Sequence, residues 1–111
     1  MAFKQIVALV RTSSLELVKE RLGLEGVKAA TVSPVEGIGL HSVLSAASYF
    51  GALVSHSRLD IYADESTVAR IVDAILEAGH TGEPGDGLVA VLPVEQAYQI
   101  RTRQPLTADS L

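Results

Sequence analysis

Runs of apolar residues alternate along the chain with segments in which apolar positions recur at helical spacing. Residues 3–10 are almost continuously apolar from Ile6 onward, which predicts a buried strand. A helix is predicted next, because Ser13 and Glu16 have the spacing of a capping box and Gly23 is a typical helix end. The apolar face of this helix is spaced at i, i+3 and i+7: Leu15, Val18 and Leu22.

The pattern of strand, strand and helix continues through the middle of the chain. A second strand is predicted over residues 27–35, where Pro34 indicates a sheet edge or a bulge. Residues 58–62 alternate as a third strand, and Asp64 is a suitable N-cap for a second helix that ends at Gly79. The apolar positions of this helix follow the i, i+3, i+4, i+7, i+8 pattern: Val68, Ile71, Val72, Ile75 and Leu76.

The last elements complete a recognisable order. Residues 88–92 are predicted to form a fourth strand, and Pro93 to permit only a short helical turn before the tail, residues 104–111. Strand, helix and strand, repeated once, predict an α+β, ferredoxin-like βαββαβ fold, with a four-stranded antiparallel sheet and both helices on one face. We expect residues 1–111 to form a single domain.

Composition changes this picture in three ways. Apolar residues make up 48% of the chain, so the sheet face without helices is expected to be buried against other subunits. The chain has no Cys, which excludes disulfides and thiolate chemistry, and a net charge of −4 without a Lys/Arg cluster disfavours nucleic acid. Residues 1–5 lack a signal-peptide pattern, which favours a cytoplasmic location.

The strongest candidate for chemistry is the segment 81–87. It contains three glycines and a proline, so it is predicted to be a turn that allows close approach of a ligand and leaves backbone N–H groups facing an anion. Arg101 and Arg103 follow one strand later and are suited to phosphate binding. The alternative is a tight hairpin turn with no ligand.

Residues 81–102 read TGxxGDGxxxVLPVExAxxIRT, which resembles the C-terminal half of the PII signal-transduction proteins. The resemblance extends to residues 3–39 and 58–103 in order and spacing, whereas residues 40–57 hardly match. It implies a homotrimer whose three sheets line the centre. It also implies a regulatory protein that senses an adenine nucleotide in a cleft between subunits and controls a partner, with no cofactor, metal or catalytic residue of its own.

The resemblance also implies roles for individual residues. Two glycine-containing segments would supply backbone contacts, Thr31 would meet the adenine edge, and Arg101 would bind phosphates. Arg103 stands where relatives carry glycine, and it is expected to compensate in part for phosphate contacts that this chain has lost. The predicted nucleotide-binding set is Thr31, Gly37, Ile38, Gly39, Gly85, Asp86, Gly87, Arg101 and Arg103.

Four positions depart from the family pattern in ways that weaken triphosphate binding. This chain has Leu88 where relatives carry a lysine, and Gln99 where they carry an arginine. It has His41 in place of a glutamine that binds magnesium and 2-oxoglutarate in relatives, and Leu40 in place of a basic residue. Each lost phosphate contact removes about 1.5–3 kcal/mol. We therefore expect AMP, ADP or a cyclic nucleotide to be favoured over magnesium-ATP. A site that has lost nucleotide binding, or one for another ligand such as bicarbonate, remains the alternative.

Residues 40–57 contain no Asp, Glu, Lys or Arg and correspond to the family's regulatory loop. Leu44, Tyr49 and Phe50 are predicted to bind a partner, for example a membrane transporter of nitrogen or inorganic carbon. The alternative is a segment that packs on its own trimer. Some relatives carry a nucleotidylated tyrosine at the position of Tyr49, but its neighbours here are apolar and unlike theirs, which disfavours modification.

The three histidines carry no pattern of a metal site or of catalysis. His41 and His56 flank the loop and are expected to lie in solvent, with a metal or anion site across the loop base as the alternative. His80 is expected to cap the C-terminus of the second helix. Without Cys or a Ser-His-Asp set in a motif context, we expect no enzyme activity.

Overall fold

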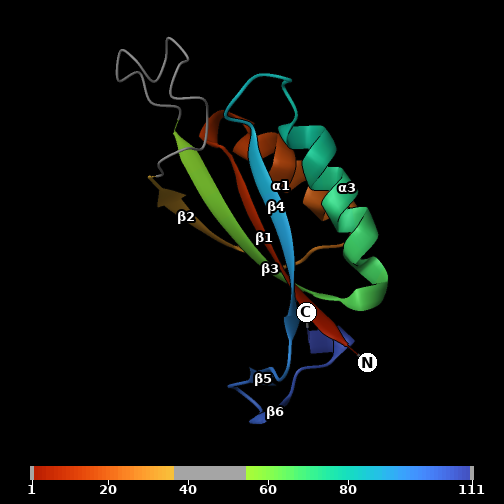
Figure 1. The fold of residues 1–111 in the computed structure, drawn as a ribbon. Helices are drawn as coiled ribbons and strands as arrows, with labels where there is room; N and C mark the ends of the chain where they lie inside the picture. Colours follow the sequence, from red (N-terminus) through yellow and green to blue (C-terminus); the bar gives the residue numbers. More distant parts are fainter. Residues whose placement is uncertain (1, 37–54, 111) are drawn as a thin grey trace.

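The structure is a computed structural model that describes residues 2–36 and 55–110 (Figure 1). Its main elements are β1 (Phe3–Arg11), α1 (Leu15–Leu24), β2 (Thr31–Val35), β3 (His56–Asp64), α3 (Val68–Gly79) and β4 (Gly87–Val94). Single 3₁₀ turns, η1 (Thr12–Ser14) and η2 (Glu65–Thr67), precede the two helices. The chain ends in β5 (Tyr98–Gln99), β6 (Gln104–Pro105) and η3 (Ala108–Ser110).

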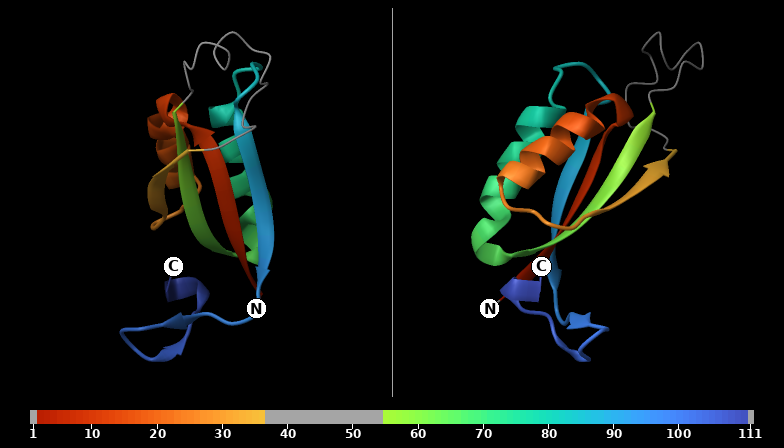
Figure 2. Two further views of the ribbon diagram at one scale, coloured as in Figure 1. Left: turned by 60° about the vertical axis from the view of Figure 1, so that its left-hand side comes forward. Right: turned by 180° about the vertical axis from the view of Figure 1, so that it is seen from behind.

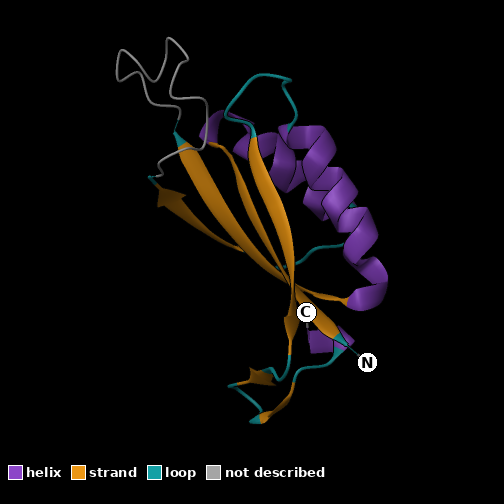
Figure 3. Cartoon of the chain, in the orientation of Figure 1, coloured by secondary structure: helices purple, strands orange, loops and turns teal. Residues whose placement is uncertain are grey.

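The four long strands form one antiparallel sheet in the order β2-β3-β1-β4. Both α-helices cover the same face of this sheet, as the view from behind in Figure 2 and the cartoon in Figure 3 show. The predicted ferredoxin-like βαββαβ fold is therefore confirmed. Within the described residues, no helix is long and apolar enough to cross a membrane.

The core lies between the helices and the sheet. Ile6 of β1 and Leu59 of β3 are fully buried, and Val18 of α1 and Ile75 of α3 pack against them from the helix layer. Burial of each such side chain contributes about 1.5–3 kcal/mol to folding. On the predicted apolar face of the second helix, Ile71 and Ile75 are buried and Val68 packs against the core, whereas Val72 is only half-buried and Leu76 is 53% exposed.

Both predicted helix caps are wrong. Ser13 lies in η1, α1 begins at Leu15, and no side chain caps it. Asp64 precedes η2 rather than α3: its carboxylate accepts a bond from Ser66 Oγ at 2.8 Å, and its carbonyl accepts one from Thr67 Oγ1 at 2.8 Å. In both cases a 3₁₀ turn leads the chain into the helix and takes the place of a side-chain cap.

Strand boundaries differ from the prediction at two places. β2 begins at Thr31 rather than residue 27, because the N–H of Val27 still bonds the Leu22 carbonyl at 3.0 Å and ties the chain to the end of α1. β4 continues through Pro93, where a helical turn was predicted. Proline is tolerated there because β4 is an edge strand and one of its sides needs no partner.

The uncovered face of the sheet has an apolar half and a polar half. Cross-strand partners share a face, and the uncovered side of β1 and β4 is almost wholly apolar: Val7, Leu9, Leu88, Ala90 and Leu92. The uncovered side of β2 and β3 is mostly polar: Thr31, Ser33, Arg58, Asp60 and Tyr62. On the polar half, Arg58 donates two hydrogen bonds to Asp60, each 3.0 Å long.

The β5–β6 hairpin lies beyond one end of the sheet, and the loop between α3 and β4 lies at the other end (Figure 1). This hairpin gives the molecule its elongated shape, 50 × 23 × 20 Å. Ile100 in its turn is 93% exposed and Tyr98 is 59% exposed. A short projecting hairpin with an uncovered isoleucine has few contacts within its own chain.

Candidate functional site

The Gly-rich turn, residues 81–87, is organised around the carboxylate of Asp86. Its Oδ2 accepts bonds from the backbone N–H of Thr81 at 2.8 Å and of Gly82 at 3.0 Å. Its Oδ1 accepts bonds from Thr81 Oγ1 and from Arg11 Nε, the latter at 3.1 Å. The bonds from Thr81, Gly82 and Arg11 hold the pKa of the Asp86 carboxyl well below its usual range, so this side chain is ionised at neutral pH.

Two glycines allow this turn to lie close to the end of β1. Gly85 and Gly87 have φ angles of +99° and +101°, in the left-handed region that side chains rarely adopt. A Cβ atom at Gly87 would lie 1.7 Å from the carbonyl oxygen of Leu9. The close approach of backbone to backbone therefore requires glycine at this position.

Arg11 and His56 hold the turn from the sheet. Arg11 donates through its terminal nitrogen to the Pro84 carbonyl at 2.7 Å. His56 lies 2.7 Å from the Gly85 carbonyl through Nε2, which must carry the proton because a carbonyl only accepts. The prediction that His56 lies in solvent is wrong: it begins β3 and is 2% exposed.

No sequence pattern indicated a role for Arg11 or His56 at this turn. Their contacts join residues 75 and 29 positions apart, and no motif connects them. His80 lies at the C-cap of α3, as predicted, with Nδ1 3.9 Å from Asp86 Oδ2. Leu88, which follows the turn, is 51% exposed on the apolar half of the sheet.

The two predicted phosphate-binding arginines lie on the turn between β5 and β6. Arg101 and Arg103 are exposed, and neither side chain has a hydrogen-bond or ion-pair partner within residues 2–36 and 55–110. Arg103 has a φ of +62°, a conformation that favours glycine, and its N–H bonds the Gln99 carbonyl at 2.8 Å. The backbone geometry at this position therefore favours glycine.

One chain does not bring the predicted nucleotide-binding residues together. Gly85, Asp86 and Gly87 lie at one end of the sheet, and Arg101 and Arg103 lie beyond the other (Figure 1). The other predicted nucleotide-binding residues, apart from Thr31, fall outside the described part of the chain: Gly37, Ile38 and Gly39. His41 and the predicted partner-binding residues Leu44, Tyr49 and Phe50 also lie outside it.

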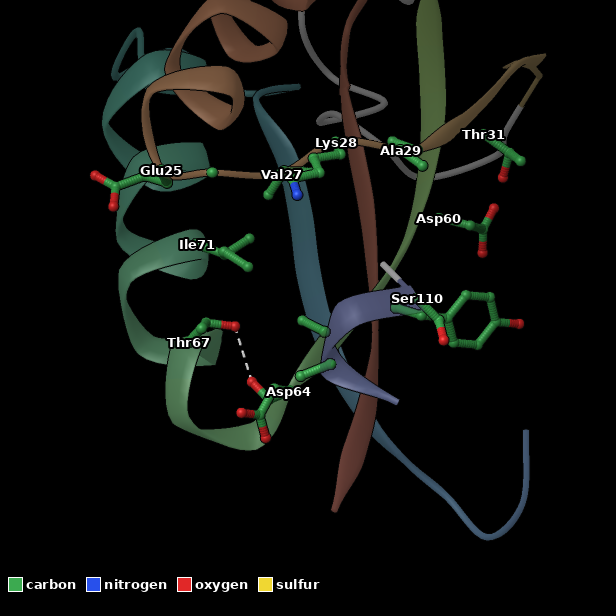
Figure 4. Close-up of a pocket in the computed structure, with 15 residues that line it drawn as sticks. Glu25, Val27, Lys28, Ala29, Thr31, Asp60, Asp64, Thr67, Ile71 and Ser110 are labelled. Carbon is green, nitrogen blue, oxygen red and sulfur yellow. Dashed lines mark hydrogen bonds between the residues drawn. The ribbon is translucent and has the colours of Figure 1, made fainter. Parts of the chain in front are cut away.

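Thr31 lines a pocket of about 410 Å³ that no sequence pattern predicted (Figure 4). The pocket forms because β2 begins only at Thr31, so the second half of β3 has no partner strand on that side. Asp60 and Tyr62 of β3, Ile71 of α3 and Ser110 of the tail supply other parts of its wall. The Arg58 guanidinium, which bonds Asp60, lowers the pKa of this carboxyl.

Metal-binding chemistry has no evident centre in the described part of the chain. Residues 2–36 and 55–110 contain no group of three or more His, Asp or Glu side chains placed to hold an ion. The features that these residues do present are a Gly-rich turn held by Asp86, guanidinium groups in the hairpin without a partner among the described residues, and a pocket with a threonine at its edge. Guanidinium groups bind anions, and such a pocket suits a small planar ligand.

A ferredoxin-like domain with this turn and this hairpin at its two ends has the architecture of a PII-type signalling regulator. The family model described as "Nitrogen regulatory protein P-II" matches residues 3–104. The chain therefore belongs to the P-II family of nitrogen regulatory proteins, and the resemblance noted from the sequence is confirmed.

Individual relatives agree with this assignment. The chain is 36% identical over 103 residues to the nitrogen regulatory protein P-II of Azospirillum brasilense, covering 89% of this chain and 92% of that protein. It is 35% identical to nitrogen regulatory protein P-II 1 of Methanothermobacter thermautotrophicus, covering 89% and 90%. The crystal structure of Arabidopsis thaliana PII bound to citrate superposes with a TM-score of 0.76 at 28% identity, covering 93% of this chain and 84% of that one.

Proposed function

We propose that this P-II protein is a trimeric regulator that binds an adenine nucleotide between subunits and controls a partner protein. The observation that carries the proposal is the separation of the two halves of the site. The Gly-rich turn and a hairpin whose two arginines have no partner among the described residues lie at opposite ends of one chain. A second copy of the chain is therefore needed for one ligand to contact both halves.

The uncovered sheet face supports such an assembly. Its apolar half, on β1 and β4, exposes Leu88 by 51% and Leu92 by 40%. Burying this half against other copies gains the free energy of removing apolar area from water. The polar half, with Thr31 and Asp60, then remains at the rim of the interface, where a polar ligand has access.

The pocket beside Thr31 is proposed to hold the adenine base. Its hydroxyl and the neighbouring backbone can pair with the base edge, and Ile71 offers an apolar contact within the pocket. The phosphates are proposed to meet the turn of one subunit and Arg101 and Arg103 of the next. Both arginines are available because neither has a partner among the described residues.

Mono- and diphosphates are proposed to bind better than magnesium-ATP. Leu88 supplies no charge, and the side chain of Gln99 accepts a bond from Thr102 Oγ1 at 3.0 Å. Arg11, the cation nearest the turn, is already bonded to Asp86 and Pro84. A third phosphate would therefore meet few uncommitted cations near the turn.

The partner is proposed to bind residues 40–57 through Leu44, Tyr49 and Phe50. A membrane transporter for a nitrogen compound or inorganic carbon would suit a cytoplasmic regulator with an uncharged loop. The second candidate is a trimeric interaction module without nucleotide binding, or a sensor of another small ligand such as bicarbonate. Asp86 favours it, because an ionised carboxylate beside the turn opposes phosphate binding.

Calorimetry with AMP, ADP, cyclic AMP, magnesium-ATP and bicarbonate decides between these candidates. We expect binding of AMP or ADP and at least roughly tenfold weaker binding of magnesium-ATP, because each absent charge-assisted bond is worth about 1.5–3 kcal/mol. Arg101→Ala should weaken nucleotide binding by the same amount. Arg21→Ala, which removes an exposed arginine bonded to Glu77, is the control and should leave affinity unchanged. Absence of nucleotide binding by the wild type would favour the second candidate.

A further inference from the structure

Two residues hold the Gly-rich turn without belonging to the predicted ligand set. Arg11 ends β1, His56 begins β3, and the two are direct cross-strand partners. Arg11 bonds Asp86 and Pro84, whereas His56 bonds Gly85. One cross-strand pair therefore fixes three consecutive residues of the turn.

The same end of the sheet is tied to the start of β3 by a second set of bonds. The N–H of Thr12 donates to the Ser55 carbonyl at 2.8 Å. The hydroxyl of Thr12 lies 3.1 Å from Ser55 Oγ and 3.0 Å from Ser57 Oγ. Ser55 and Ser57 flank His56 in the sequence. The start of β3 is therefore bonded to Thr12, which follows Arg11, and through His56 to the turn.

The bond between His56 and the turn is shielded from water, because His56 is only 2% exposed. The bonds of Arg11 lie nearer the surface: its side chain is 15% exposed and that of Asp86 is 26% exposed. A buried hydrogen bond is costly to leave unmade, since water cannot replace the lost partner. A displacement of the turn therefore moves His56 with it rather than breaking the bond to Gly85, and the two bonds of Arg11 add a second connection.

We propose that Arg11 and His56 form a positioning clamp that makes the Gly-rich turn and the start of β3 move as one unit. Its use by a ligand rests on the proposed function: an anion that displaces the turn also shifts Ser55 and Ser57. β3 directly follows residues 40–54 in sequence. A displacement of the turn therefore also displaces the point at which this segment joins β3.

Amide hydrogen exchange of the free protein tests the clamp without a ligand. Each variant breaks one side, and exchange is measured on the other. In Asp86→Asn, the amide of Thr12 should exchange roughly tenfold faster, although its own bond to Ser55 is untouched. In His56→Ala, the amides of Thr81 and Gly82 should exchange faster by a similar factor, although Asp86 is unchanged.

Controls separate the clamp from general destabilisation. The amides of Val27 and Leu106, bonded to Leu22 and Ala97, lie outside the clamp and should keep their exchange rates. His56→Gln retains a side-chain N–H donor and should restore much of the protection that His56→Ala loses.

Two results would overturn the proposal. One is an unchanged exchange rate at Thr12 in Asp86→Asn while Thr81 and Gly82 become unprotected. The other is a His56→Gln protein that behaves like His56→Ala. Failure of the wild type to bind a nucleotide would contradict the proposed function alone, because these exchange measurements involve no ligand.

Discussion

The Gly-rich turn and the β5–β6 hairpin are predicted to serve one ligand, yet they are built in opposite ways. The turn is held by bonds that the Asp86 carboxylate accepts and by bonds that Arg11 and His56 donate, and its backbone geometry requires Gly87. The hairpin lies beyond the sheet, with Ile100 almost fully exposed and Arg101 without a partner among the described residues. One region is fixed before a ligand arrives, and the other has its charges uncommitted.

This difference indicates how the binding free energy is divided. Backbone donors in a fixed turn lose little conformational freedom on binding. Long arginine side chains on a projecting hairpin lose rotamer entropy when they order, up to about 1.5–2 kcal/mol each. In the proposed site, the turn would supply geometry, whereas the hairpin would supply charge and complete the site when another subunit brings it close.

The largest expected effect is on the fixed region. Gly87→Ala places a Cβ atom against the Leu9 carbonyl at a φ of +101°, so it should destabilise the protein by about 3 kcal/mol or more. Gly23→Ala is the matched control: no atom lies within 4 Å of its Cβ position inside α1, and it should stabilise the protein by about 0.5–1 kcal/mol. Urea unfolding measures both, and equal stabilities would contradict the proposed close approach.

Replacing Asp86 should make the free energy of unfolding of the protein less dependent on pH. The folded-state pKa of this carboxyl is lowered, so its contribution is fully present above the unfolded pKa of about 3.9 and is lost as pH falls through the folded value. Asp86→Asn should therefore be less stable than the wild type at pH 7, and the difference should shrink towards pH 2. Urea midpoints across this range test it; a difference that does not vary with pH would be inconsistent with an ionised Asp86.

The smallest expected effect is on the hairpin. Arg103→Gly relieves a left-handed conformation and should stabilise the protein by about 0.5–1 kcal/mol, while weakening nucleotide binding through loss of the charge. Arg103→Asn separates the two causes, because asparagine tolerates this conformation but carries no charge. Thermal unfolding and calorimetry measure the two effects. An unchanged nucleotide affinity in both variants would remove Arg103 from the site.

The sequence predicted the fold better than it predicted the site. Periodicity identified the buried faces of α1 and α3, because Val18 and Ile75 each lie at helical spacing from other apolar residues of their own helix. Sequence-local patterns could not reveal the bond between His56 and Gly85, since it depends on the register of β3 beside β1. The pocket at Thr31 also escaped prediction, because it depends on the late start of β2 and on the position of Ser110.

The central claim is that the turn of one subunit and the hairpin of another form one site, and mixed trimers test it most directly. Asp86→Ala loosens the turn, and Arg101→Ala removes the charge from the hairpin, so trimers of either variant alone should bind ADP weakly. Mixed trimers from co-expression should regain tight binding at one site, because one interface pairs an unaltered turn with an unaltered hairpin. If mixed trimers bind ADP no better than either variant alone, the site lies within a single chain and the account is contradicted.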